Sequence, residues 1–495
     1  MMADSNRASA TRTPLGITFF LLLVAHVILK LHAGWSISSL VPTGDENAYI
    51  DAAKALSNLC RDVLHLAWPD IGELRRNVVV NGWFMPGMPV VLTPLYAVAP
   101  DAGTTTLRIY LGCVSFALWL WVVLSVHRHL GRVYAYALMI FPSLVPLWLA
   151  FSFTAWGDLY AGLLIVILFC HSFTAIRRIH DYGVFTLWDG IRLGALAVAA
   201  LYLRSSVSPL VLLLFVFLGF ASLTSTYRHR RLHMLAGIAA AIGTFIAVLL
   251  PWSLSASLAL HAPVTTTTTV PLSMAVTFGD HGKLCFGPCG RGNIWFRTVA
   301  YSKAVARDAG VSELTIQKEM SRYAMQGVTP AGYASDVLGN FGRYAFNPGS
   351  FALFFARASL PASEPHDSRT SWLRTSTTIP YFAFMTLLVV AWFTVVRRTR
   401  DDQIASLLIK LFSVGLLAQP FVHVSGGRYW TTFGPMFALA AGLLWSLLRN
   451  QRLAGCSNAP PSAWLTSLQW AFVAAVVVAF ATLLTLGAQG GYFRP

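Results

Sequence analysis

The chain has 495 residues, of which 56% are hydrophobic and only 11% are charged, and its mean hydropathy is +0.61. Because soluble domains carry about 25% charged residues, this composition excludes a soluble fold and predicts an all-α polytopic membrane protein. The formal net charge of +16 does not indicate a nucleic-acid partner, since the basic residues form short clusters between apolar runs, as in cytoplasmic loops under the positive-inside rule.

Apolar runs that can cross a bilayer occur along most of the chain. We predict eleven crossings, at 14–32, 104–126, 133–152, 159–176, 190–203, 207–224, 233–258, 378–396, 404–422, 430–448 and 464–487. The first run follows Arg7 and Arg12, and no small-residue cleavage site comes after it. We therefore expect a retained membrane anchor with the N-terminus inside.

The segment 84–100 is also apolar, but Pro86, Pro89 and Pro94 disfavour a straight crossing helix. If this segment crossed, three basic loops would lie outside, against the positive-inside rule: 127–132, 177–189 and 226–232. We therefore predict a juxtamembrane segment. The chain then divides into an N-terminal transmembrane module (1–258) with its first outer loop (33–103), a large extracytoplasmic loop (259–377) and C-terminal transmembrane helices (378–495).

The large loop 259–377 is too long for a simple connector. Helices are predicted to start at Ser312 and at Thr329, while the run from Thr265 to Thr269 is read as an extended, β-prone stretch. Cys285 and Cys289 are expected to form a small disulfide if the loop lies outside, with free thiols or a metal pair as the alternatives.

The first outer loop begins with an acidic pair, Asp45-Glu46, directly after the anchor. Thr43-Gly44-Asp45-Glu46 fits a capping box, in which Thr43 caps a helix and Glu46 reaches back to its first amides. Apolar residues then recur with helical spacing from Tyr49 to Leu66, which predicts a helix lying in the membrane interface. Carboxylates beside lipid are costly, so the pair either starts this helix or also does chemistry.

Under this topology, further polar residues lie on the outer side. Asp158 follows Gly157 at the start of one crossing, Arg204 ends another, and Arg428-Tyr429 precedes a third. Helix capping for the acid and interface anchoring for the Arg-Tyr pair are the simpler readings. Because these residues share one face with Asp45, they also predict a common site there.

Several motifs in this order resemble the GT-C superfamily of membrane glycosyltransferases, in particular bacterial relatives of protein O-mannosyltransferases and of the aminoarabinose transferase that modifies lipid A. The similar segments are Gly44-Asp45-Glu46-Asn47-Ala48-Tyr49, Pro86-Gly87-Met88-Pro89, Phe153–Asp158, Leu203-Arg204, Leu250-Pro251-Trp252 and Gly427-Arg428-Tyr429 with Gly434-Pro435. The chain departs from the pattern at Ser255 and Ala256, where relatives often carry an Arg-Asn pair that contacts the donor head.

The resemblance implies a GT-C-like bundle of about eleven helices with juxtamembrane helices in the first outer loop. It also implies an enzyme of cell-envelope glycan biosynthesis in the bacterial inner (cytoplasmic) membrane, with its active site facing the periplasm or exterior. The donor would be a polyprenyl-phosphate sugar, and the acceptor a lipid, a glycan or a protein. No P-loop or dinucleotide motif is present in the sequence.

Such a transfer needs a carboxylate as general base and cations for the leaving phosphate. We expect Asp45 to be the base, with Asp158 and Glu46 as further catalytic candidates. Expected substrate-binding residues are Arg428, Tyr429, Arg204, Lys283 and His281. A divalent metal held by Asp45 and Asp158 is left open.

Three other classes of protein share parts of this pattern. A transporter or flippase of a lipid-linked glycan would be expected to show repeats and ionisable residues inside its spans. An O-antigen-ligase-like enzyme would share the large loop without the acidic pair in the first loop, and a scaffold protein would need no site. The sugar and the acceptor are not determined by the sequence.

Overall fold

The computed structural model describes residues 16–80, 82–284, 294–358, 367–451, 453 and 459–492, and helices are its only regular secondary structure over these residues. Among the described residues, nine helices are long and apolar enough to cross a membrane. They are α1 (Ile17–Ile37), α5 (Thr104–His129), α8 (Gly157–Tyr182), α10 (Ser208–Thr224), α11 (Arg231–Leu260), α17 (Asp367–Phe393), α18 (Arg400–Leu416), α19 (Trp430–Leu448) and α20 (Ala463–Gln489). The chain is therefore a helical, multi-pass membrane protein.

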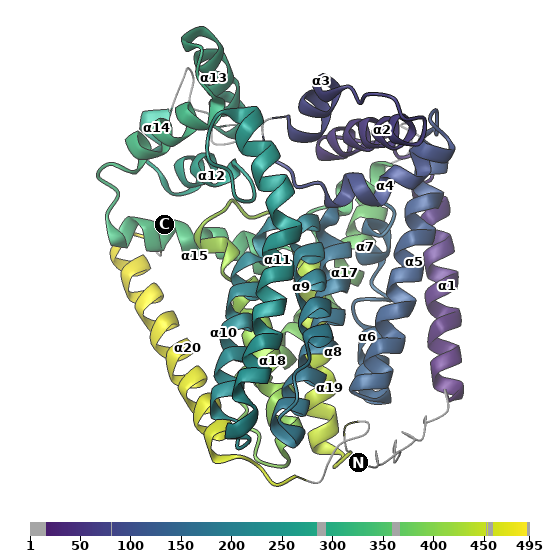
Figure 1. The fold of residues 1–495 in the computed structure, drawn as a ribbon, viewed down its shortest axis with the longest axis vertical. Coiled ribbons are helices and arrows are strands. Elements are labelled where there is room, and N and C mark those ends of the chain that lie inside the picture. The colour runs from purple at the N-terminus through teal and green to yellow at the C-terminus, as the bar shows by residue number, and fades with distance from the viewer. Residues whose placement is uncertain are drawn as a thin grey trace.

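Two predicted crossings take a different form. Where one helix was expected over 133–152, the chain forms α6 (Arg132–Ile140) and α7 (Pro146–Phe151), which are separated by a turn containing Pro142. The crossing expected at 190–203 is α9 (Leu187–Leu203), which has 17 residues. Both lie beside the long helices in the bundle (Figure 1). The predicted total of eleven crossings counts these two together with the nine long helices, and it stays a prediction.

The segment 45–98 folds into helices across one end of the bundle (Figure 1), which we call the capped end. They are α2 (Asp45–Leu64), α3 (Ile71–Leu74), a π-helical turn η1 (Arg75–Val79) and α4 (Gly87–Val98). Ala53 of α2 packs with Met88, Leu92 and Leu95 of α4. The segment predicted to be juxtamembrane is thus a 12-residue helix that packs under α2.

The capping box is only half present. Gly44 occupies the N-cap with φ of +55°, a left-handed conformation that glycine adopts without penalty, and no side chain caps α2. Glu46 does reach back, since its Oε2 accepts a hydrogen bond from the amide of Thr43 at 3.3 Å. The expected apolar stripe is buried at Ala52 and Ala53, but it is exposed at its far end.

The large loop also lies at the capped end (Figure 1). Its helices are α12 (Thr269–Phe278), η4 (His281–Leu284), α13 (Ile294–Ala309), α14 (Glu313–Met325), α15 (Pro330–Ala345) and α16 (Ala352–Arg357). The predicted starts are confirmed, because Ser312 caps α14 and Thr329 caps α15 through their side chains. The threonine run is not a strand: Thr269 begins α12. Cys285 and Cys289 lie outside the described residues.

Close backbone approaches around the start of α8 position the candidate site. A Cβ at Gly157 would lie 2.2 Å from the carbonyl oxygen of Leu203, so only glycine allows this contact with the end of α9. One turn further on, a Cβ at Gly162 would lie 2.8 Å from the carbonyl oxygen of Thr431 in α19. These approaches bring Asp158 beside the residues that follow α9 and precede α19.

Candidate functional site

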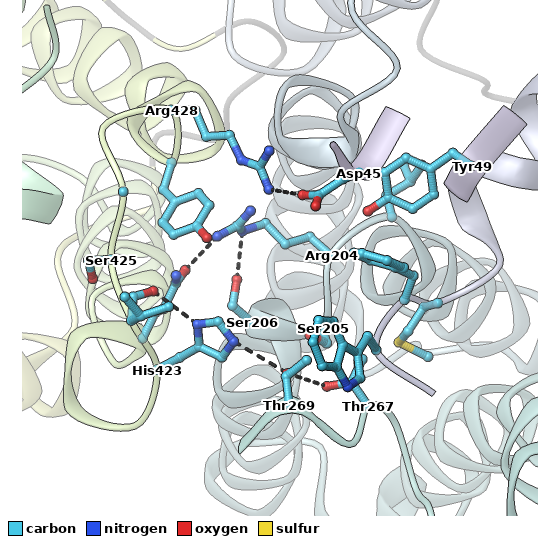
Figure 2. A pocket seen from close by; sticks show the side chains of 18 residues that line it. Asp45, Tyr49, Arg204, Ser205, Ser206, Thr267, Thr269, His423, Ser425 and Arg428 are labelled. Atoms are coloured by element: carbon cyan, nitrogen blue, oxygen red, sulfur yellow. Dashed lines mark hydrogen bonds and ion pairs between the residues drawn. The ribbon is translucent and has the colours of Figure 1, made fainter. Parts of the chain in front are cut away.

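A polar cavity of about 460 Å³ lies at the capped end of the bundle. Five separate stretches of chain line it: the start of α2, residues 83–85, residues 203–206, the threonine run, and the segment between α18 and α19. Figure 2 shows ionic side chains on one side of this cavity and a chain of hydroxyl and imidazole groups on the other.

The ionic side is formed by Asp45, Arg428 and Arg204, which line the cavity, together with Asp158, which joins the two arginines beside it. Nη2 of Arg428 lies 2.6 Å from Oδ2 of Asp45, and its Nε lies 3.2 Å from Oδ2 of Asp158. Arg204 pairs with the other oxygen of Asp158. The exposed fraction of these side chains rises from 5% for Asp158 to 33% for Asp45. Their formal charges cancel, and Asp45 is the acid most open to a ligand.

The two guanidinium groups are also held by neutral neighbours. Arg204 donates from Nε to Ser206 at 2.8 Å and from Nη2 to Gln419 at 2.9 Å, and it lies 3.9 Å above the centre of the Tyr429 ring. Burial lowers the pKa of Arg204. Burial also acts to lower the pKa of Arg428, but Tyr429 and Asp45 outweigh it, so this pKa is raised. Both groups are cations at neutral pH.

The segment between α18 and α19 is fixed by Asn340 of α15. Its side-chain nitrogen donates to the carbonyl oxygens of Pro420 and His423, and its oxygen accepts from the amide of Ser425 at 2.9 Å. Asn340 is fully buried, so these contacts are shielded from water. This anchoring places Gln419, His423 and Arg428 around the cavity.

Glu46 does not line the cavity. Both of its oxygens bind Arg108, at 2.6 and 3.0 Å, and Oε1 also accepts from the amide of Ala155 at 2.8 Å. Arg108 and Glu46 have side-chain exposures of 1% and 0%. Arg108 further donates to the carbonyl oxygens of Leu40 and Phe153. This ion pair therefore ties the start of α2 to the segment that leads into Asp158.

The structure brings together Asp45, Asp158, Arg204, Arg428 and Tyr429, as the sequence predicted. It does not place Lys283 with them. That ammonium donates to the carbonyl oxygens of Tyr323 and Gln326, at 3.3 and 2.5 Å, within the large loop. The side chain of His281 lies outside the described part of the chain.

The arrangement does not fit a metal ion bridging Asp45 and Asp158. The guanidinium of Arg428 contacts both carboxylates, so it occupies the position that a bridging cation would take. Among the residues that the structure describes, no group of three His, Cys, Asp or Glu side chains could hold a metal ion.

Sequence reasoning missed several residues of the cavity, above all Gln419, His423, Thr267 and Thr269. Gln419 and His423 could have been found, because they are polar residues at the end of an apolar run and close to Gly426-Gly427-Arg428. Sequence reasoning also missed Arg108, which lies within the predicted crossing 104–126. An arginine there indicates a buried partner.

The pH dependence of stability is expected to report on His423. Burial lowers its pKa to about 4, helped by Arg204 and Arg428 and opposed by the hydrogen bond to Val424. The unfolded group titrates near 6.5, so the unfolded chain takes up more protons and the stabilisation is lost as the pH falls from about 6.5 towards 4. Between pH 7.5 and 5, the wild type should lose about 2 kcal/mol more stability than His423→Gln.

This difference is measured by thermal unfolding in detergent at both pH values. Other buried histidines contribute equally to both proteins, so they cancel in the comparison. Parallel pH profiles for the two proteins would show that His423 is not held neutral.

No protein family and no curated protein compared with this sequence gives a match. The fold and composition define a helical, multi-pass membrane protein.

Proposed function

We propose that the protein is a GT-C-like glycosyltransferase that moves a sugar from a polyprenyl-phosphate donor to an acceptor. The observation that carries the proposal is the alternating cluster of Asp45, Arg428, Asp158 and Arg204, which comes from four distant parts of the sequence. Asp45, Arg204 and Arg428 line one cavity at the capped end, and Asp158 joins the two arginines beside it. A purely structural role does not require ionic groups to line an open cavity of this size.

Each charge has a role in this chemistry. Arg204 and Arg428 would neutralise the phosphate that leaves as the glycosidic bond breaks. Asp45, the most exposed acid, would accept the proton of the acceptor hydroxyl as it attacks the sugar carbon. Asp158 would hold both guanidinium groups in place. Burial raises the pKa of Tyr49, with a further contribution from Asp45, so its phenol would stay protonated beside the base.

The proposal includes the finer topology. Eleven crossings, counting α6–α7 and α9 with the nine long helices, would place the capped end outside the cell. The basic clusters between the spans would then lie inside, including Arg228 and Arg230. The cavity would then lie level with the outer leaflet, so a lipid-linked donor in that leaflet would reach it directly.

Cysteine labelling tests this orientation. In a cysteine-free background, a membrane-impermeant maleimide is expected to label Asp101→Cys but not His129→Cys in intact cells. These residues lie at opposite ends of α5, with Asp101 just before it and His129 as its last residue. Labelling of His129→Cys alone would reverse the assigned orientation.

A transfer assay tests the activity. Purified protein in liposomes is supplied with radiolabelled polyprenyl-phosphate sugars and a total membrane lipid, glycan and protein acceptor mixture. Arg428→Lys should raise KM for the donor about tenfold, because lysine keeps the charge but loses the fork that contacts two carboxylates. Arg449→Lys, which replaces an exposed arginine stacked on Trp445 just after α19, is the matched control.

Absence of transfer from every donor would overturn the proposed activity. Equal KM values for Arg428→Lys and the wild type would instead remove Arg428 from the phosphate site.

A further inference from the structure

The wall of the cavity opposite the ionic cluster is built from uncharged groups. Oγ1 of Thr267 lies 3.2 Å from Oγ1 of Thr269, which in turn lies 3.3 Å from Nε2 of His423. The other imidazole nitrogen, Nδ1, lies 2.9 Å from the carbonyl oxygen of Val424. Figure 2 shows these three side chains as a connected row, which we call the hydroxyl wall.

The direction of the hydrogen bonds along this wall follows from their ends. A carbonyl oxygen can only accept, so Nδ1 of His423 carries the proton and Nε2 accepts from Thr269. The hydroxyl of Thr269 has then used its proton, so it accepts from Thr267. The free positions of both hydroxyls are therefore acceptors, which suit a ligand that offers hydroxyl protons.

The backbone that carries the two threonines is fixed. The indole nitrogen of Trp252 donates to the carbonyl oxygen of Thr266 at 2.7 Å, and Ser253 donates to that of Thr265 at 2.6 Å. The amide of Thr268 donates to the carbonyl oxygen of Gly82 at 2.9 Å. The hydroxyl wall is thus preorganised, which lowers the entropy lost when a ligand binds.

Two different features of the hydroxyl wall select against charged ligands: nearby positive charge disfavours a cation, and the lack of a hydrogen-bond donor on the wall disfavours a carboxylate. Arg204 and Arg428 both lower the pKa of His423, so a ligand cation at the wall would meet the same repulsion. Asp45, the acid that lines the cavity, and Asp158 beside it are already paired with these arginines. A ligand carboxylate would find only acceptors on the wall, and a charge left without a partner is costly to bury.

We propose that the hydroxyl wall of Thr267, Thr269 and His423 binds the ring of the transferred sugar and restricts the donor to an uncharged sugar. This inference rests on the proposed function, because it assigns the sugar end of a donor whose phosphate lies at Arg204 and Arg428. The ionic side of the cavity then carries the reaction, and the hydroxyl wall carries the specificity.

Equilibrium binding to the purified protein in detergent at pH 7.5 tests the inference without an acceptor. Three donors share one isoprenyl-phosphate and carry a neutral hexose, an amino sugar or a uronic acid. The neutral donor should bind about tenfold more tightly than either charged donor. A difference of this size corresponds to one or two hydrogen bonds gained or lost. The double variant Thr267→Val/Thr269→Val should weaken the neutral donor about tenfold and remove the preference.

The matched control is Thr265→Val/Thr266→Val, in the same run but outside the cavity lining, and it should bind as the wild type does. Thermal unfolding of both double variants shows whether they are folded, and the single variant Thr267→Val replaces the double variant if that one is not. Equal or tighter binding of a charged donor would overturn the inference and leave the proposed function standing. Absence of binding by all three donors would overturn both.

Discussion

Arg108→Met is expected to destabilise the protein by about 3–5 kcal/mol, the cost of leaving one member of a buried ion pair without its partner. The side chain of Glu46 has no exposed area, and Arg108 supplies two of its hydrogen bonds. The same substitution removes the donors to the carbonyl oxygens of Leu40 and Phe153. Methionine keeps an unbranched stem as long as that of arginine up to Nε, so the loss is mainly that of the charged guanidinium group and its hydrogen bonds.

The measurement is the midpoint of thermal unfolding in detergent, followed by intrinsic fluorescence. Glu46→Gln/Arg108→Met, which removes both charges, should recover much of the lost stability. Arg76→Met breaks an ion pair whose side chains are 69% and 60% exposed, so it should change stability by no more than about 1 kcal/mol. A midpoint for Arg108→Met as close to the wild type as that of Arg76→Met would show that the buried pair does not stabilise the fold.

The Glu46–Arg108 pair also illustrates which part of the site can be predicted from the sequence. The pattern of apolar runs and basic loops placed Asp45, Asp158, Arg204 and Arg428 on one side of the membrane, because loop charge alone constrains that assignment. The sequence shows that Asp45 and Glu46 are adjacent, but it does not show that Glu46 turns away from the cavity. Its partner Arg108 is 62 residues distant in sequence, and only the packing of α2 on the bundle brings them together.

The uncharged side of the cavity could not be predicted from the sequence for a different reason. Threonine and histidine residues have no periodicity that marks them as ligand-binding, and the run from Thr265 to Thr269 has the composition of a strand. Hydrogen bonds from Trp252 and Ser253 at the end of α11 fix it as a loop instead. Tertiary contacts overrode the local preference there, whereas the break between α6 and α7 lies at Pro142, a signal that the sequence does contain.

Asp45→Asn is expected to lower the rate of sugar transfer by about 10²–10⁴-fold, the contribution of a positioned general base. The amide retains the size of the carboxylate and can still contact Arg428, but it cannot take up the proton of the acceptor hydroxyl. Arg428 keeps its second partner, Asp158, at 3.2 Å, so the fold and the donor site should persist. The variant should therefore lose kcat while the KM for the donor stays within about threefold of the wild type.

Asp51→Asn is the matched control, because Asp51 lies in the same helix α2 but lines a separate polar pocket with Lys54 and Asn58. It should transfer at the wild-type rate. Undiminished kcat in Asp45→Asn would mean that another group accepts the proton, and the role of Asp45 would then be limited to holding Arg428. A loss of kcat together with a large rise in KM would point to the same positioning role, since Arg428 would then have moved away from the donor phosphate. Only a selective loss of kcat identifies Asp45 as the base, because proton transfer contributes to the transition state and not to the binding of the donor.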